Sequence, residues 1–279
     1  MNSCSSDTNH QVYERNDVAA HYAGLDHLTP CEQLLFDTYV PLGGEVLDLG
    51  VGGGRTTPYL ANRASRYVGI DYSAAMIKAC RTKFPLLEFG VVDAADLSAF
   101  PDASFDLVVF AFNGIDYVLP ADRRRSCLAH IQRVLKPGGR LIFSSHNPRS
   151  IVVRPSWNRQ RLHRIAQQYS AGSRVLYSVL WAALTLARSA IAAGQAIGAT
   201  SMRTLTKVPS RTFWRGEGSL MDTAHGGLLT HYGTPQRVLA ELAALQFSPE
   251  QILGDDYPKS SHSYVTDWYY YVFTKKLEK

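Results

Sequence analysis

The sequence has few cysteines and few of the residues that favour disorder. Its four cysteines, Cys4, Cys31, Cys80 and Cys127, stand far apart in 279 residues. No pair has metal-ligand spacing, and so low a density does not support a disulfide framework, so we expect reduced thiols in a cytoplasmic protein. The 21 Gly and 13 Pro are close to ordinary usage, which excludes collagen-like and low-complexity chains. With 19% charged and 11% aromatic residues, the chain is not intrinsically disordered.

Two kinds of long apolar segment are also missing. The first ten residues, MNSCSSDTNH, have neither the basic head nor the apolar run of a secretory signal, so we expect a short flexible tail. Residues 175–199 are largely apolar, but only 13 residues of this stretch precede Arg188, fewer than a bilayer span requires. We expect a buried or amphipathic helix pair in this stretch.

Acidic residues are absent from a third of the chain. From Arg123 to Gly216 there are 17 Lys and Arg and no Asp or Glu, so the rest of the chain holds 29 − 17 = 12 basic residues and all 24 acidic ones. This asymmetry favours an anionic ligand, an anionic membrane surface or nucleic acid as a partner of the basic part. The alternative is a solvated helical face rich in arginine.

Short apolar runs alternate with segments of helical periodicity. The runs that predict strands cover residues 45–49, 66–71, 86–94, 105–113, 139–147, 249–254 and 267–276. The segments that predict helices cover residues 56–64, 73–84, 121–136 and 234–247. Such alternation indicates βαβ units and a parallel sheet, and near-continuous apolar strands indicate that helices cover both faces of it.

A glycine loop follows the first predicted strand. It reads Asp48-Leu49-Gly50-Val51-Gly52-Gly53-Gly54, and an acidic residue, Asp71, follows the next strand 21 residues after Gly50. Glycines let the backbone approach a ligand closely, and an acid at this spacing can accept hydrogen bonds from ribose hydroxyls. The loop is neither the G-x-G-x-x-G of dinucleotide-binding proteins nor a P-loop, which would carry a lysine.

The D-x-G-x-G form of this loop resembles motif I of class I S-adenosylmethionine-dependent methyltransferases. The resemblance continues in order through YVGIDYSAAMI, VVDAADL, FDLVVFAFNGIDYV and RVLKPGGRLIFSSHN. It covers residues 12–147 closely and 234–275 by pattern only, and a dehydrogenase of the Rossmann type would not share the third and fifth motifs. It implies an α/β fold: a Rossmann-like, doubly wound, mostly parallel sheet of seven strands, with a helical insertion after the fifth strand.

The resemblance implies S-adenosyl-L-methionine as the cofactor. The glycine loop would contact its methionine part, Asp71 its ribose hydroxyls and Asp93 its adenine amino group. The matching cofactor-binding positions are Tyr13, Tyr22, Asp48, Gly50, Gly52, Asp71, Tyr72, Asp93, Ala94, Phe112 and Asn113. We expect three parts: the N-terminal helix and cofactor-binding core (1–147), a mostly helical basic and apolar insertion that caps the substrate (148–225), and the rest of the core (226–279).

Three histidines are candidate general bases for methyl transfer: His146, His225 and His231. His146 ends the fifth predicted strand, where the ligand crevice of a parallel sheet lies, although a purely structural hydrogen bond would explain it equally well. The candidate substrate-binding residues are Tyr117, Arg149, Arg154 and Tyr232, and Asp116 is a further candidate at the mouth of the site. No His, Asp and Glu cluster has metal-ligand spacing, so we expect no metal.

The sequence therefore predicts a methyltransferase of a small-molecule acceptor, acting on oxygen or nitrogen. Arginines and aromatic residues in 148–225 suit an acceptor with an anionic group and an apolar body. Methylation of RNA or protein is an alternative that only the basic stretch supports, and we expect no nucleic-acid partner. A non-catalytic cofactor-binding protein also remains open. The chain would be a monomer or a homodimer, and 148–225 could cap the site, form a dimer contact or touch a membrane.

Overall fold

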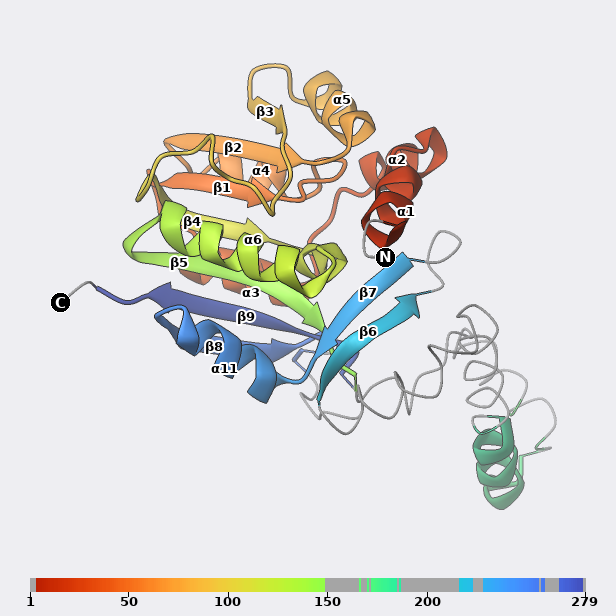
Figure 1. Cartoon of the computed structure of the whole chain (residues 1–279). Coiled ribbons are helices and arrows are strands. Elements are labelled where there is room, and N and C mark those ends of the chain that lie inside the picture. Colours follow the sequence, from red (N-terminus) through yellow and green to blue (C-terminus); the bar gives the residue numbers. More distant parts are fainter. Residues whose placement is uncertain are drawn as a thin grey trace.

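Seven strands form one sheet in the computed structural model, in the order β3-β2-β1-β4-β5-β9-β8 (Figure 1). The structure describes residues 4–148, 166, 170, 172–184, 186, 216–222, 228–255, 257–258 and 266–277. The strands are β1 (Glu45–Leu49), β2 (Arg66–Asp71), β3 (Glu88–Val91), β4 (Phe105–Phe110), β5 (Leu135–His146), β8 (Phe247–Gly254) and β9 (Trp268–Lys275). β1 to β5 pair in parallel, whereas β9 runs antiparallel to both β5 and β8. The predicted mostly parallel seven-stranded α/β sheet is confirmed.

Helices cover both faces of this sheet. They are α1 (Cys4–Tyr13), α2 (Asn16–Ala23), α3 (Pro30–Tyr39), α4 (Thr57–Ala61), α5 (Ala74–Lys83), α6 (Ala121–Val134) and α11 (Pro235–Ala244), with a 3₁₀ turn η1 (Gly114–Tyr117). Buried side chains of α6 and α11 pack in one apolar cluster with the sheet, and those of α3, α4 and α5 pack in a second. Because helices cover both faces of the sheet, strand residues on both faces are buried, and the strands have no polar side.

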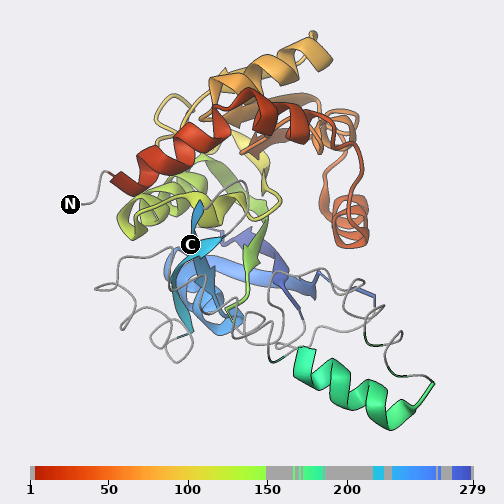
Figure 2. The same ribbon diagram turned by 90° about the vertical axis from the view of Figure 1, so that its right-hand side faces the viewer.

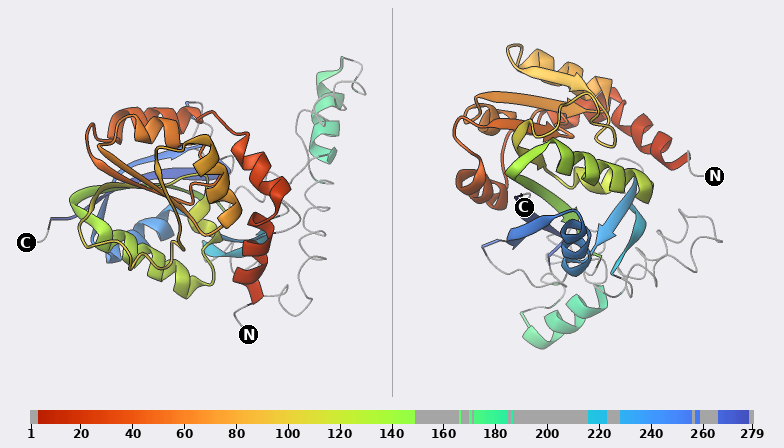
Figure 3. Two further views of the ribbon diagram at one scale, coloured as in Figure 1. Left: turned by 90° about the horizontal axis from the view of Figure 1, so that it is seen from above. Right: turned by 60° about the vertical axis from the view of Figure 1, so that its left-hand side comes forward.

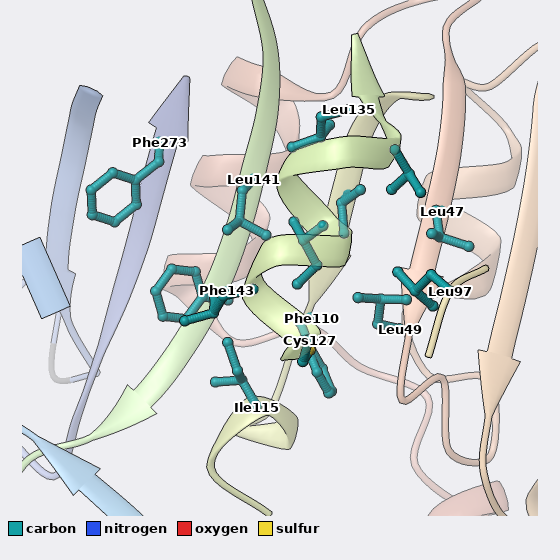
Figure 4. Packing of buried hydrophobic residues seen from close by; sticks show 14 of the residues in the cluster. Leu47, Leu49, Leu97, Phe110, Ile115, Cys127, Leu135, Leu141, Phe143 and Phe273 are labelled. Carbon is teal, nitrogen blue, oxygen red and sulfur yellow. The ribbon is translucent and has the colours of Figure 1, made fainter. Parts of the chain in front are cut away.

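The α6 face forms the larger of the two clusters (Figure 4). Leu47 and Leu49 of β1 and Phe143 of β5 are fully buried there with Cys127 of α6. Burying one such side chain is worth about 1.5–3 kcal/mol, so this cluster fixes the strands against α6. The strand ends that form the site are thereby held in place.

The boundary between α6 and β5 differs from the predicted one. The helix was expected to reach Lys136 and to stop at Pro137-Gly138-Gly139, but it ends at Val134, and all four of these residues belong to β5. In the pairing with β4, Phe105 is opposite Leu135 but Leu107 is opposite Arg140. The extra residues of β5 form a bulge, and Gly138 takes a φ of 80° there, which glycine adopts without strain.

A second, two-stranded sheet was not predicted. β6 (Glu217–Asp222) and β7 (Leu228–Gly233) pair antiparallel, although the insertion that contains β6 was expected to be mostly helical. Asn9 of α1 pairs with the backbone of Leu229 in β7 through its side-chain amide nitrogen (2.9 Å) and oxygen (3.1 Å). This contact brings the N-terminal helix to the small sheet.

The described part of the insertion also contains a helix over residues 174–184, which Figure 2 shows outside the body of the molecule. Most of residues 149–215 lie outside the described residues, so the predicted cap is not tested. Over the residues that are described, no helix combines the length and the hydropathy needed to cross a bilayer.

Candidate functional site

A cavity of about 310 Å³ lies where β1, β2 and β4 end. Its size is that of a small-molecule site. Ten of the predicted site residues line it: Tyr13, Tyr22, Gly50, Gly52, Asp71, Tyr72, Asp93, Ala94, Phe112 and Tyr117. The cavity is therefore at the carboxyl edge of the parallel strands, the position expected for a ligand in this type of sheet.

The glycine loop forms the floor of this cavity. Gly50 and Gly52 have φ values of 59° and 53°, a region that other residues avoid. A Cβ on Gly50 would lie 2.7 Å from the Phe110 ring, whereas one on Gly52 would meet only Tyr22, at 3.9 Å. The backbone of Gly52 is thus open toward the cavity, so a ligand can approach it closely.

Asp71 joins the loop to the following strand. Its Oδ2 accepts a hydrogen bond from Gly52 N (3.0 Å), and its Oδ1 accepts one from Ser73 N (2.9 Å). Burial raises the pKa of Asp71 to about 6, although these two backbone donors oppose the increase. A buried carboxylate at the cavity wall favours further hydrogen-bond donors, such as hydroxyl groups.

Asp48 lies below the loop and does not line the cavity. Its Oδ2 accepts hydrogen bonds from Thr56 Oγ1 (2.7 Å) and Tyr67 Oη (2.9 Å). Burial raises its pKa to about 6, against the effect of both hydroxyls. These contacts tie the loop to Thr56, which precedes α4, and to Tyr67 of β2.

Asp93, which follows β3, and Tyr72, which follows β2, add an acid and a hydroxyl to the cavity wall. Asp93 accepts a hydrogen bond from Ala95 N through Oδ1 (2.8 Å), and its Oδ2 forms an ion pair with Arg123 of α6. The hydroxyl of Tyr72 lines the same wall, is buried and has no hydrogen-bond partner in the described part of the chain. Such a group normally indicates a missing partner.

Aromatic side chains close the cavity from the N-terminal helices. The ring centroid of Tyr13 lies 6.0 Å from those of Tyr22 and Tyr72 and 5.9 Å from that of Tyr117. These are distances typical of edge-to-face packing. Tyr13 of α1 and Tyr22 of α2 therefore form part of the cavity wall, and Figure 3 shows these two helices beside the sheet.

A second group of polar side chains lies beside the cavity, beyond Tyr117. His146 at the end of β5 contacts Asp116 Oδ2 through Nδ1 (2.9 Å) and the Asn113 amide nitrogen through Nε2 (3.2 Å). Because a carboxylate only accepts, Nδ1 carries the proton and Nε2 is left with a lone pair. His146 does not line the cavity itself, but its ring packs against Tyr117, which does.

Asp116 does not lie at the mouth, as we had expected, but is completely buried. It also accepts hydrogen bonds from Ser145 Oγ (2.8 Å) and from the backbone N of His146 (2.6 Å), and it pairs with Arg124 Nη1 (3.4 Å). Burial alone would raise the pKa of Asp116, but the hydrogen bond from His146 and the charge of Arg124 hold it below the ordinary value. The carboxylate therefore stays ionised.

The other candidates either belong to this group or lie outside the residues that the structure describes. Burial and the charge of Arg124 lower the pKa of His231 to about 4, so it is neutral at pH 7 and a weaker base than an ordinary imidazole. Tyr232 packs its ring 5.0 Å from that of His146. The remaining candidates, Arg149, Arg154 and His225, lie outside the described residues. Where the structure describes the chain, no three potential ligands gather as a metal site.

Sequence reasoning missed Arg55, the residue after the glycine loop. It lines the cavity, donates to both Glu32 carboxylate oxygens at 2.6 Å, and lies 4.7 Å from the Phe112 ring centroid. The only local signal was the capping box of Thr29 and Glu32 at the start of α3, which indicated a helix start rather than a buried ion pair.

Residues 46–139, about a third of the chain, match the family described as "Methyltransferase domain". This match agrees with the resemblance of the motifs to class I S-adenosylmethionine-dependent methyltransferases. A solved S-adenosylmethionine-dependent methyltransferase from Methanosarcina mazei, 20% identical, superposes with a TM-score of 0.56 over 91% of this chain and 100% of its own. At that identity the likeness is one of fold.

Curated relatives match part of the chain. A fatty-acid O-methyltransferase of Mycolicibacterium smegmatis is 36% identical over 42% of this chain and 42% of its own length. A demethylmenaquinone methyltransferase of Paenarthrobacter aurescens is 35% identical over 42% of this chain and 44% of its own. The chain thus matches less than half the length of either relative.

Proposed function

We propose that this protein transfers a methyl group from S-adenosyl-L-methionine to a small-molecule acceptor that has an apolar body and an ionisable group. The observation that carries the proposal is the cavity at the glycine loop, with a carboxylate-bound histidine next to its wall. Of the two relatives named above, one is a fatty-acid O-methyltransferase, and a fatty acid has an apolar chain and a carboxylate; the other is a demethylmenaquinone methyltransferase.

The residues present fit the cofactor. Gly52 offers an open backbone to the methionine part, Asp71 a carboxylate to the ribose, and Tyr72 a buried hydroxyl without a partner in the described chain. Asp93 and Ala94 lie where the adenine ring would be bound, with Arg123 held beside them by the ion pair. When bound, the cofactor supplies an electrophilic methyl group.

On the acceptor side, His146 is the candidate general base. The charge of Asp116 and its hydrogen bond fix the protonated Nδ1, so the lone pair of Nε2 is free to take the proton of an acceptor group as that group is methylated. The Asn113 amide donates to Nε2 in this structure, and the acceptor would replace it as the partner of Nε2. Tyr117 and Tyr232 flank this imidazole and are proposed to contact the acceptor.

The division into parts remains a proposal as well. We retain residues 1–147 and 226–279 as the core and 148–225 as an insertion, with Arg149 and Arg154 as candidate ligands of an anionic group. His225 and His231 stay secondary candidates for the base.

Label transfer tests the function. The protein is incubated with methyl-labelled S-adenosyl-L-methionine and, separately, with a long-chain fatty acid, a demethylated quinone and a cell-extract metabolite pool. We expect mass analysis to find the label in a small amphiphilic molecule. Label that enters only RNA or protein would contradict the acceptor class. Calorimetric binding of the cofactor without any labelled product would indicate a non-catalytic protein.

A further inference from the structure

The helix over residues 174–184 presents an apolar face to solvent. Val175 is 76% exposed and Val179 is 60% exposed, and Leu186, which is also helical, is 71% exposed. Positions 175, 179 and 186 fall on one side of a helix with 3.6 residues per turn. Soluble proteins rarely expose an apolar row of this kind unless it binds something.

The opposite side of the helix is aromatic. Tyr177 and Trp181 lie on the side away from Val175, with stacked rings 6.3 Å apart. These rings are not part of the exposed row. From 174 to 184 the sequence holds one charged residue, Arg174, and it is basic.

The sequence around this helix has a single sign of charge. Between residues 149 and 215 there are 11 Lys and Arg and no Asp or Glu. A second copy of the chain would bring the same positive charges against each other, and like charges oppose a symmetric dimer. An anionic lipid surface offers both an apolar layer for the exposed row and negative charge for the flanking residues.

From these observations we infer that the 174–184 helix docks onto an anionic lipid bilayer, lying in the plane of its surface. Figures 1 and 3 draw this helix outside the body, on the side of the sheet at which β1, β4 and β5 end. The helix is therefore drawn on the side of the sheet at which the cavity-forming strands β1 and β4 end. The inference does not require methyl transfer, because it concerns attachment alone.

Vesicle co-sedimentation of the full chain tests the docking. The probe is a vesicle of equal parts phosphatidylcholine and phosphatidylglycerol, compared with one of phosphatidylcholine alone. We expect the protein to bind the anionic vesicle, and added salt to weaken that binding because the attraction is partly electrostatic. Equal binding to both vesicles, or to neither, would overturn the inference.

A matched pair of double variants assigns the binding to the helix. Val175→Asp with Val179→Asp should lower vesicle affinity about tenfold or more, because two apolar contacts become charged. Leu42→Asp with Leu86→Asp is the control: both side chains are exposed, at 84% and 96%, but belong to the body of the protein. The control should bind as the wild type does, and circular dichroism checks that both variants fold.

Light scattering separates the lipid surface from self-association. If the wild type forms a dimer that the Val175 and Val179 variant abolishes, while vesicle binding is the same in both, the face is a dimer contact and the inference is wrong. Cofactor binding is measured in the same variants and should not change. A loss of vesicle binding with intact cofactor binding therefore leaves the proposed enzymatic function untouched.

Discussion

Two sets of buried aspartates lie at the carboxyl edge of the sheet, and they are stabilised in different ways. On the cofactor side, Asp48 and Asp71 accept hydrogen bonds only from hydroxyls and backbone amides, and their pKa is raised to about 6. On the acceptor side, Asp116 faces Arg124 and His146, and its pKa is lowered. Hydroxyl and amide donors do not outweigh the cost of burial at Asp48 and Asp71. At Asp116 the charge of Arg124, together with the His146 hydrogen bond, does.

The two sides therefore respond oppositely to pH. For Asp48 and Asp71 the folded pKa exceeds the ordinary 3.8, so their contribution to stability is complete below about pH 4 and is lost as the pH rises through 6. For each of these two carboxyl groups, the difference between the folded and the ordinary pKa corresponds to about 3 kcal/mol of folding free energy. Asp116 contributes stability above its ordinary pKa, and that stability is lost only as the pH falls through the lowered value. We infer that the Asp71 carboxylate remains available to hydrogen-bond donors of a ligand in the cavity, whereas Asp116 is already paired with Arg124 and His146.

The largest expected effect tests whether the acceptor side performs chemistry. His146→Ala should lower the methyl-transfer rate about 10²–10⁴-fold, because a positioned base is lost, while leaving cofactor affinity nearly unchanged. Turnover and calorimetric binding are measured side by side. The control is His130→Ala on α6, near Asp96 on the surface. Wild-type turnover in the His146 variant at every pH would leave orientation of the substrates as the whole mechanism.

The next effect concerns the stability of the acceptor side. Asp116→Asn removes the buried partner of Arg124 and should lower the free energy of unfolding by about 3 kcal/mol, measured by urea denaturation. Asp102→Asn is the matched control, because Asp102 pairs with Arg133 at the surface. It should cost less than about 1 kcal/mol. If both variants lose the same free energy of unfolding, the contacts of Asp116 with Arg124 and His146 are not what stabilises the acceptor side.

A smaller effect is expected on the cofactor side. Asp71→Ala should weaken S-adenosyl-L-methionine binding about 10–100-fold, because hydrogen bonds to a charged group are worth about 1.5–3 kcal/mol. The chain should still fold, since removing a buried carboxylate of raised pKa also removes its desolvation cost. Calorimetry gives the affinity. Unchanged affinity would exclude Asp71 from the cofactor site.

The smallest effect is the pH dependence of cofactor binding. If the ribose hydroxyls need the ionised form of Asp71, affinity should fall as the pH drops below about 6 and be about tenfold weaker at pH 5. Above pH 7 it should be constant. The slope should disappear in Asp71→Asn. A slope that persists in that variant would assign the titration to another group, with Asp48 as the first candidate.

The parts of the fold that sequence predicts well are local. Three features depend on residues close in sequence: the order of the motifs along the chain, the Ser73 cap of α5 and the spacing from Gly50 to Asp71. Periodicity and turn chemistry therefore indicate them. β6 and β7 were missed because neither EGSLMD nor LLTHYG has the continuous apolar run that marks the strands of the main sheet. Their pairing with each other, and that of β7 with Asn9, comes from tertiary structure.

The site divides in the same way. Asp71 and the glycine loop follow from a local pattern, but the burial of Asp116 does not. Its environment depends on Arg124 and His146, and Arg124 reaches Glu241, 117 residues away. Likewise Glu32 and Arg55 are 23 residues apart and belong to different elements. No spacing rule relates such pairs.

The position of β9 has a consequence for the order in which the chain folds during synthesis. β9 inserts between β5 and β8, and His146 of β5 pairs with Trp268 of β9. Strands β1 to β5, with the whole glycine loop, are available once residue 146 has been made. The edge of β5 that faces β9 has no partner strand until residues 268–275 have been synthesised. β5 carries Leu141 and Phe143, which are buried in the folded protein. The cofactor half of the sheet can thus form early, whereas β5, which ends in His146, gains its second neighbouring strand last. Between the synthesis of residue 146 and that of residues 268–275, the chain is most exposed to misassembly.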